Sequence, residues 1–225
     1  MSFALTRAEL GYRVERLRSR GPQVVRRDYG ELLAKVFILT LFSGMASAMA
    51  QDFAQTGHVT GLLLLVSEAL VVLLTVVRRQ ATVVDRTWAA RMIATISIVG
   101  VPFIRPTGGG LAPDLVTAAV SGVGLLIIIA GKLTLGRSFG LMPANRGIVC
   151  RGIYKTLRHP IYAGYLVTHA AFLVAHPSPW NLAVLVVSDA ALMIRAVYEE
   201  RTLALDAEYA DYMTRVRWRV APGLF

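Results

Sequence analysis

The run VTGLLLLVSEALVVLLTVV, at residues 59–77, is long and apolar enough to cross a lipid bilayer as a helix. It has no polar face, which a helix on the surface of a soluble bundle would need. Five other apolar runs are predicted to be spans, of which 88–104 is weaker and contains Arg91 and 161–175 is short for a full crossing, and the mean hydropathy of the chain is +0.56. We therefore predict an all-α, polytopic membrane helix bundle with about six spans, at residues 32–50, 59–77, 88–104, 113–134, 161–175 and 180–198.

Positive charge alternates between the predicted loops. Arginine and lysine are abundant before the first span, in the second and fourth loops and after the sixth span, whereas the other loops hold one arginine, Arg105, or none. Short cytoplasmic loops carry such an excess of basic residues, so both ends of the chain are predicted to lie in the cytoplasm. This topology accounts for the net charge of +10 without a nucleic-acid partner.

Three regions follow from this pattern. Residues 1–31 are basic and, with Leu10, Val14 and Leu17 on one stripe, predict an amphipathic helix on the surface of anionic lipid; a merely soluble basic extension is the alternative. Residues 32–134 form a four-span bundle, and residues 135–225 contain the polar, chemistry-bearing segments. The single cysteine, Cys150, is interpreted as an inert thiol, and with no CxxC pair we predict no metal site.

The last two spans are joined by the short turn HPSP and predict a helical hairpin whose inner ends lie side by side. The cluster RHPIY at residues 158–162 opens the first helix of this hairpin, and Arg195 and Glu199 share a face near the end of the second. Ionisable groups inside a membrane are costly, so His169 and Asp189, both within these spans, are expected to pair across the hairpin. The hairpin therefore predicts a polar site at one membrane face.

The stretches GIYKTLRHPIYAG (152–164), RAVYEERTL (195–203) and YADYMTRVRWRVAP (209–222) resemble the isoprenylcysteine carboxyl methyltransferase family and its phospholipid methyltransferase relatives. The resemblance covers about residues 135–222. It implies an integral membrane enzyme that uses S-adenosylmethionine, with a cytoplasmic cofactor pocket formed by the C-terminal half. The acceptor implied is lipophilic or membrane-proximal, either a lipid or a prenylated molecule with an isoprenylcysteine-like carboxylate.

The resemblance also implies roles for individual residues. The cofactor-binding residues by position are Ile148, Val149, Tyr154, His159, Pro160, Ile161, Tyr162 and Glu199. Arg195 falls at an arginine on the substrate side, and Arg195 and Glu199 are the predicted catalytic pair. The chain departs from the eukaryotic pattern at Arg146, where a histidine is usual, and in a shorter segment between the glutamates and Tyr209.

The chemistry of the donor is compatible with these residue types. Tyrosine faces and a carboxylate suit a sulfonium cation, and an ionised carboxylate or thiolate acceptor needs no general base. An amine acceptor would have to lose a proton, which Glu199 or Glu200 could assist. Two other functions stay open at this point: an NADPH-dependent sterol-type reductase, although Ile161 and Tyr165 replace the asparagine and aspartate of that pattern, and a non-catalytic lipid-binding membrane protein.

Overall fold

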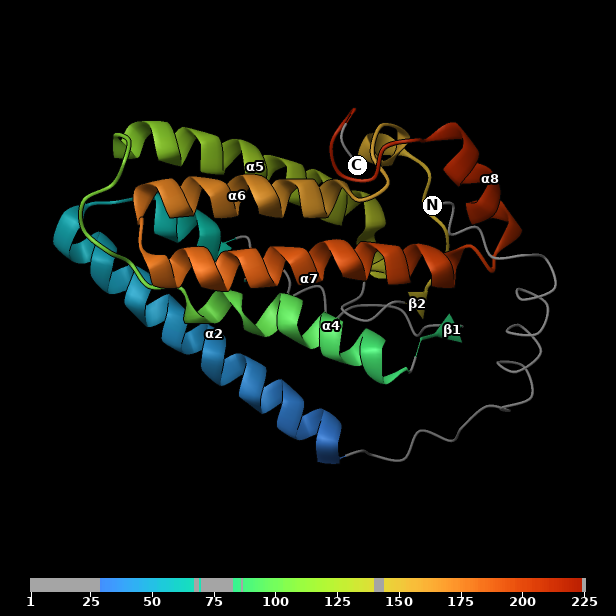
Figure 1. Ribbon diagram of the computed structural model, residues 1–225, viewed down its shortest axis with the longest axis horizontal. Helices are drawn as coiled ribbons and strands as arrows, with labels where there is room; N and C mark the ends of the chain where they lie inside the picture. The colour runs from blue at the N-terminus through green and yellow to red at the C-terminus, as the bar shows by residue number, and fades with distance from the viewer. Residues whose placement is uncertain (1–28, 67–68, 70–82, 86, 140–143, 224–225) are drawn as a thin grey trace.

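The computed structural model describes residues 29–66, 69, 83–85, 87–139 and 144–223. Its elements, named as in Figure 1, are α2 (Tyr29–Thr56), β1 (Val83–Val84), α4 (Trp88–Val99), η1 (Val101–Phe103), α5 (Asp114–Leu135), η2 (Gly136–Ser138), β2 (Ala144–Asn145), η3 (Gly152–Lys155), α6 (Pro160–Ala175), α7 (Pro179–Leu203) and α8 (Ala207–Arg215). Residues 60–66 are also helical. The predominantly helical fold is as predicted, and the paired strands β1 and β2, two residues each, are an addition to it.

Two helices in the described part of the chain are long and apolar enough to cross a membrane. They are α5 with its following turn, Asp114–Ser138, and α7, Pro179–Leu203. The helices Trp88–Phe103 and Pro160–Ala175 are apolar but shorter. The structure therefore supports two of the six predicted spans by length and composition. The predicted span at 59–77 lies largely outside the described residues, as does the predicted amphipathic helix within residues 1–28.

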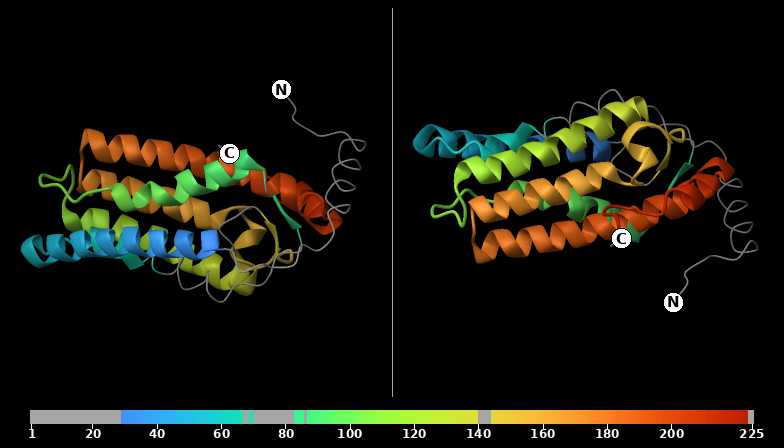
Figure 2. Two further views of the ribbon diagram at one scale, coloured as in Figure 1. Left: turned by 90° about the horizontal axis from the view of Figure 1, so that it is seen from below. Right: turned by 90° about the horizontal axis from the view of Figure 1, so that it is seen from above.

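Helices α4, α5, α6 and α7 lie nearly parallel, and α2 crosses them obliquely (Figure 1). The turn between α6 and α7 is short because His176 ends one helix and Ser178 caps the next, its side chain accepting a hydrogen bond from the Asn181 amide at 3.0 Å. Helix α8 and the short strands gather at the end of the bundle where α7 ends (Figure 2). This end holds the polar segments.

Glycines allow α5 and α6 to approach each other closely. A Cβ atom on Gly164 of α6 would lie 2.7 Å from the carbonyl oxygen of Gly124 in α5, and a Cβ on Gly124 would lie 2.9 Å from the Gly164 carbonyl. Ile161 packs over Gly131 one step along the same interface. Small residues at such crossings let helix backbones pack by direct van der Waals contact, as in membrane bundles. The position of α6 against α5 is thereby fixed.

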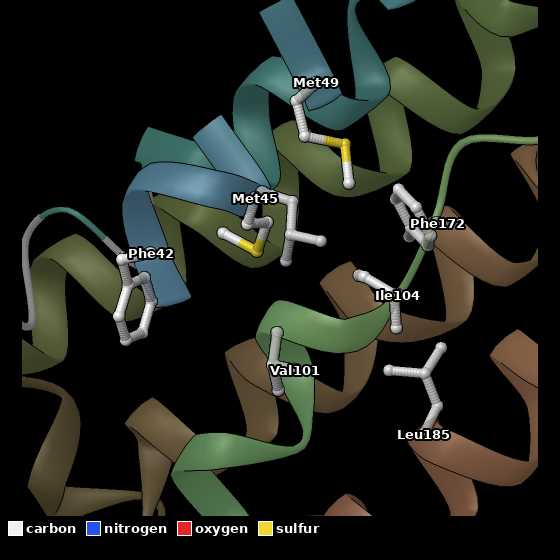
Figure 3. Close-up of a cluster of buried hydrophobic side chains, with 8 residues drawn as sticks. Phe42, Met45, Met49, Val101, Ile104, Phe172 and Leu185 are labelled. Carbon is white, nitrogen blue, oxygen red and sulfur yellow. The ribbon is translucent and has the colours of Figure 1, made fainter. Parts of the chain in front are cut away.

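An apolar core joins α2 to the rest of the bundle at the end opposite α8. Figure 3 shows Phe42, Met45 and Met49 of α2 facing Val101, Ile104, Phe172 and Leu185. The flexible methionine side chains fill the irregular space between helices that cross at an angle. The outward faces of α5 and α7, in contrast, expose large apolar side chains such as Leu115, Leu126 and Val186. Such faces suit contact with lipid.

Candidate active site

The α6–α7 hairpin brings the RHPIY cluster and the two glutamates together, as predicted. His159 caps the start of α6 and Pro160 takes its first position, where a proline ring is favoured because no backbone donor is lost. Helix α7 continues beyond the predicted limit at residue 198 to Leu203, so Glu199 and Glu200 lie in its last turns. Two hydrogen bonds then join the helix ends, one from His159 to Glu200 and one from Tyr162 to Glu199.

Glu200 is the centre of a buried charge cluster. Its Oε1 lies 3.2 Å from both Arg158 Nη1 and His159 Nε2, and its Oε2 accepts a hydrogen bond from Arg219 Nε at 2.9 Å. The Glu200 residue is 5% exposed, so its charge is removed from bulk water and needs these hydrogen-bonding partners, two of which are guanidinium groups. One carboxylate thus connects the start of α6, the end of α7 and the segment that follows α8.

The backbone after α8 is hydrogen-bonded to the start of α6. The Arg158 amide donates to the Trp218 carbonyl at 2.9 Å, and the His159 amide donates to the Arg219 carbonyl at 2.7 Å. The Arg158 guanidinium also donates to the Arg217 carbonyl at 3.0 Å. The first amides of a helix have no hydrogen-bond acceptor inside the helix. Residues 217–219, the returning segment, supply carbonyl acceptors for the amides just before α6. The segment is therefore part of the site.

Glu199 faces a different direction from Glu200, because adjacent residues of an α-helix are turned by about 100°. The Tyr162 hydroxyl donates to Glu199 Oε2 at 2.6 Å. The Tyr162 ring stacks on the His159 ring, with centroids 5.1 Å apart, and the Arg195 guanidinium lies 5.5 Å from the Tyr162 ring centroid. Carboxylate, imidazole, phenol and guanidinium thus form one connected set.

This set lines a cavity. Among the residues predicted to bind cofactor or act in catalysis, the cavity is lined by Ile148, Val149, Tyr154, His159, Ile161, Tyr162, Arg195 and Glu199. Pro160 is not among the lining residues, and its position at the first turn of α6 is structural. Arg146, at the departure from the family pattern, lines the cavity as well. The segment before α6 and the end of α7 therefore face a common space.

Helix α4 also contributes to the cavity, through Ser97, Ile98 and Val101 of α4 and η1. The pocket is therefore not formed by the C-terminal half alone, which corrects the prediction. The reason is packing: α4 lies directly against α7, and Gly100 leaves room for Ser188 at their contact. Apolar side chains of α4 thus cover the part of the cavity farthest from α8.

Three tyrosines near α8 complete the polar end of the cavity. Tyr154, Tyr209 and Tyr212 all line it, and the Tyr212 hydroxyl donates to the Tyr154 carbonyl at 2.6 Å. Burial raises the pKa of Tyr154 well above its usual value, and the nearby Glu199 charge raises it further. Burial likewise raises the pKa of Tyr209 and of Tyr212. These phenols are therefore neutral at physiological pH and can donate hydrogen bonds.

The predicted pair in the middle of the hairpin is confirmed. His169 Nδ1 of α6 lies 2.6 Å from Asp189 Oδ1 of α7. His169 is 3% exposed and lines the cavity, and its Nε2 is buried without a hydrogen-bond partner among the described residues. His169 and Asp189 also line a second, apolar groove between α6 and α7. The pair stands between the groove and the cavity.

Sequence reasoning missed several residues of this site. No role was assigned to Arg158 within the RHPIY cluster, or to Tyr209 and Tyr212 within the stretch 209–222, but Arg158 binds Glu200 and both tyrosines line the cavity. The pair of adjacent glutamates, Glu199 and Glu200, did indicate that Glu200 has a partner of its own. Adjacent residues of a helix point in different directions, so when Glu199 faces the cavity Glu200 must face a neighbouring element. The partners of that second carboxylate could not be identified, because Arg158 and Arg219 lie far from it in the sequence.

Comparison with known proteins adds an independent finding. Residues 116–209 match a family model described as phospholipid methyltransferase, a range that begins in α5 and ends in α8. No curated protein matches the chain. The matched range contains every predicted site residue from Ile148 to Glu199. Residues 116–209 therefore contain a phospholipid methyltransferase domain, a family related to the isoprenylcysteine carboxyl methyltransferases that the sequence motifs resemble.

Proposed function

We propose that the protein is a membrane methyltransferase that takes a methyl group from S-adenosylmethionine and transfers it to an amine of a lipid-like acceptor. The observation that carries this proposal is the cavity at the inner end of the α6–α7 hairpin, most of whose lining residues lie in the matched range. It is lined by Glu199, His159 and the tyrosines near α8, and also by His169, which is hydrogen-bonded to Asp189. The arginine-rich loops beside the cavity support a cytoplasmic opening.

The residues present fit S-adenosylmethionine. Its sulfonium is a cation, and cations bind well beside a carboxylate and over aromatic faces, which Glu199 and the tyrosines of the cavity supply. Its carboxylate end suits a guanidinium, and Arg146 and Arg158 both line the cavity. Gly147 lines the cavity with a φ of 102°, a conformation that residues with a side chain rarely adopt. Because glycine has no Cβ atom, a ligand can come close to the backbone there. When bound, the molecule supplies a methyl group on a sulfonium sulfur, which keeps the bonding electron pair as the acceptor atom bonds the methyl carbon.

The chain's own residues position the reactants. Tyr162, bonded to Glu199 and stacked between His159 and Arg195, has little freedom to rotate, so the carboxylate is held in one orientation. Buried helices exclude water from the reacting atoms, and positioning with desolvation can provide a large share of the rate of a displacement. Glu200 has a different part: it holds the returning segment and Arg158 in place and is not among the residues lining the cavity.

The His169–Asp189 pair points to an acceptor that must lose a proton. With Nδ1–H donated to Asp189, the Nε2 of His169 keeps a lone pair on the cavity side. A protonated amine donates one proton to this nitrogen before its own lone pair attacks, and Asp189 stabilises the imidazolium that forms. A carboxylate acceptor would need no such base. We therefore place an amine ahead of an isoprenylcysteine-like carboxylate.

The apolar groove supplies a route from the bilayer. Its lining includes Leu166, Ala170 and Leu173 of α6 and Val186 of α7, and it shares His169 with the cavity. An acyl chain lying in this groove would keep a headgroup amine near His169 without leaving the lipid. Replacing the exposed Ala170 with tryptophan should block this route and spare donor binding. Val187, equally outward on α7 but outside the groove, gives the matched control Val187→Trp.

The experiment uses the full chain in lipid nanodiscs. Calorimetric titration with S-adenosylmethionine and with NADPH should give binding of the first only, and Glu199→Gln should weaken it at least tenfold. Incubation with labelled donor and two acceptor sets, aminophospholipids and prenylcysteine carboxylates, then identifies the methylated species by mass spectrometry. Label on the carboxylate set alone would overturn the amine assignment. Binding of NADPH without binding of the methyl donor would overturn the methyltransferase proposal.

A further inference from the structure

A second group of ligand-type side chains lies at the opposite end of α6 from the cavity. Asp52 is in the last turn of α2, His58 is in the turn that follows, and His176 caps the C-terminus of α6. The Asp52 Oδ2 atom lies 3.8 Å from His58 Nδ1 and 3.8 Å from His176 Nε2. One ligand atom from each residue falls within 4.8 Å of the other two. The length of α6 puts this group about 25 Å from His159, outside the methyltransferase site.

His176 has the orientation of a metal ligand. It is 0% exposed, and its Nδ1 lies 2.9 Å from the Thr107 carbonyl oxygen and 3.2 Å from the Thr107 amide. We assign the proton to Nδ1, because the carbonyl acceptor at 2.9 Å is nearer than the amide donor at 3.2 Å, which would favour the other tautomer. The other nitrogen, Nε2, then carries a lone pair directed at the carboxylate.

Two buried acceptor atoms in this group lack partners. Neither His176 Nε2 nor Asp52 Oδ2 has a hydrogen-bond partner among the described residues, and both atoms are inaccessible to solvent. Two lone pairs facing each other without a proton or a cation between them are costly in a buried place. A divalent cation satisfies both at once, and it also binds the Nδ1 lone pair of His58.

The surrounding backbone holds the group in place. Asp114, at the start of α5, accepts hydrogen bonds from the Val59 amide at 3.2 Å and from the Thr60 hydroxyl at 3.0 Å. Gly57 gives the turn its positive φ of 75°, and the His58 amide donates to the Thr56 hydroxyl oxygen at 3.2 Å. The His58 side chain is 34% exposed, so it can rotate toward an entering ion. The site is thus partly assembled, with one adjustable ligand.

We propose that Asp52, His58 and His176 bind a zinc ion, with water as the fourth ligand. Two imidazoles and one carboxylate are ligands that zinc prefers, and metal–ligand bonds of about 2.1 Å place tetrahedral ligand atoms about 3.4 Å apart. The two separations from Asp52 are 3.8 Å, and all three ligand atoms lie within 4.8 Å of one another, so the partly exposed His58 side chain must move inward to complete the site. The ion ties the end of α2 to the α6–α7 turn. It has no part in methyl transfer.

The test measures metal in the full chain purified with a tag free of histidine. Plasma mass spectrometry should find one zinc per chain after dialysis, and none in His58→Ala, whose partly exposed side chain lies outside the apolar core. His169→Ala is the matched control: it removes a histidine next to a carboxylate at another site, and it should keep the zinc. Adding zinc to chelator-treated protein should raise the unfolding temperature of the parent chain and of His169→Ala, but not of His58→Ala.

Cobalt gives a second measurement on the unaltered chain. Tetrahedral Co²⁺ in this site should absorb in the visible range, and zinc should displace it. The proposal is overturned if the parent chain binds less than one zinc in ten chains, or if His58→Ala keeps a full equivalent. It is also overturned if added zinc leaves the unfolding temperature of the parent chain unchanged. Donor affinity should be the same with and without chelator, which separates this test from that of the methyltransferase.

Discussion

The two adjacent glutamates at the end of α7 are predicted to have separable roles, one in stability and one in binding. Glu200→Gln removes a buried negative charge and leaves Arg158, His159 and Arg219 without their common partner. Breaking a buried ion pair from one side costs about 3–5 kcal/mol. Because Arg219 is 31% exposed and water can solvate it, the lower end, about 3 kcal/mol, is expected.

For a chain of this length the loss corresponds to a fall in unfolding temperature of about 6–12 °C. The control is Glu199→Gln. The amide oxygen of glutamine can still accept the hydrogen bond from the Tyr162 hydroxyl, but that bond is no longer strengthened by a negative charge. Its expected cost is about 1 kcal/mol, or about 2–4 °C. Donor affinity should follow the reverse order and fall most in Glu199→Gln. Both quantities are measured on nanodisc-embedded protein, by calorimetric melting and by titration. If Glu200→Gln melted with the parent chain but no longer bound the donor, the assignment of the two carboxylates would be reversed.

Three other predictions concern different parts of the chain. Gly164→Ala places a methyl group 2.7 Å from a backbone carbonyl of α5 and should cost about 1–3 kcal/mol, whereas Gly122→Ala, which meets nothing within 4 Å, should melt with the parent chain or above it. His169→Gln should abolish methylation of an amine while donor affinity, measured by titration, stays within twofold; equal loss of both would make His169 a packing residue. Burial and the Glu208 charge raise the pKa of Cys150, so its alkylation by iodoacetamide at pH 8 should be slower in folded than in denatured protein.

The sequence was sufficient for the elements that carry regular patterns. Apolar runs located α2, α4, α5, α6 and α7 to within a few residues, except that α2 begins and ends outside its run and α7 extends to Leu203. The short turn and the spacing of Arg195 and Glu199 were enough to predict the hairpin and the His169–Asp189 pair. These features depend on periodicity and on the high energy of ions within the membrane, both of which can be evaluated locally.

Contacts between distant segments could not be predicted in this way. Nothing in the run at 88–104 indicates that Ser97 and Ile98 face the cavity, because that depends on how α4 rotates against α7. The same holds for Asp52, His58 and His176, which come from three separate elements and were not recognised as a possible metal site. The ion pair between Glu200 and Arg219 could not be predicted either, because several basic residues near the end of the chain could have been the partner of Glu200.

The hydrogen bonds between residues 217–219 and the start of α6 also set an order of assembly. The α6–α7 hairpin can form as soon as both of its apolar runs have been synthesised. The hydrogen bonds from Arg158 and His159 to residues 218 and 219 form only after that later segment has been synthesised. We therefore expect a species in which the hairpin has formed but residues 217–219 are not yet bound to precede the complete fold. In that species Glu200 lacks Arg219 as a partner, and Arg158 and His159 lack the backbone carbonyls of residues 217–219.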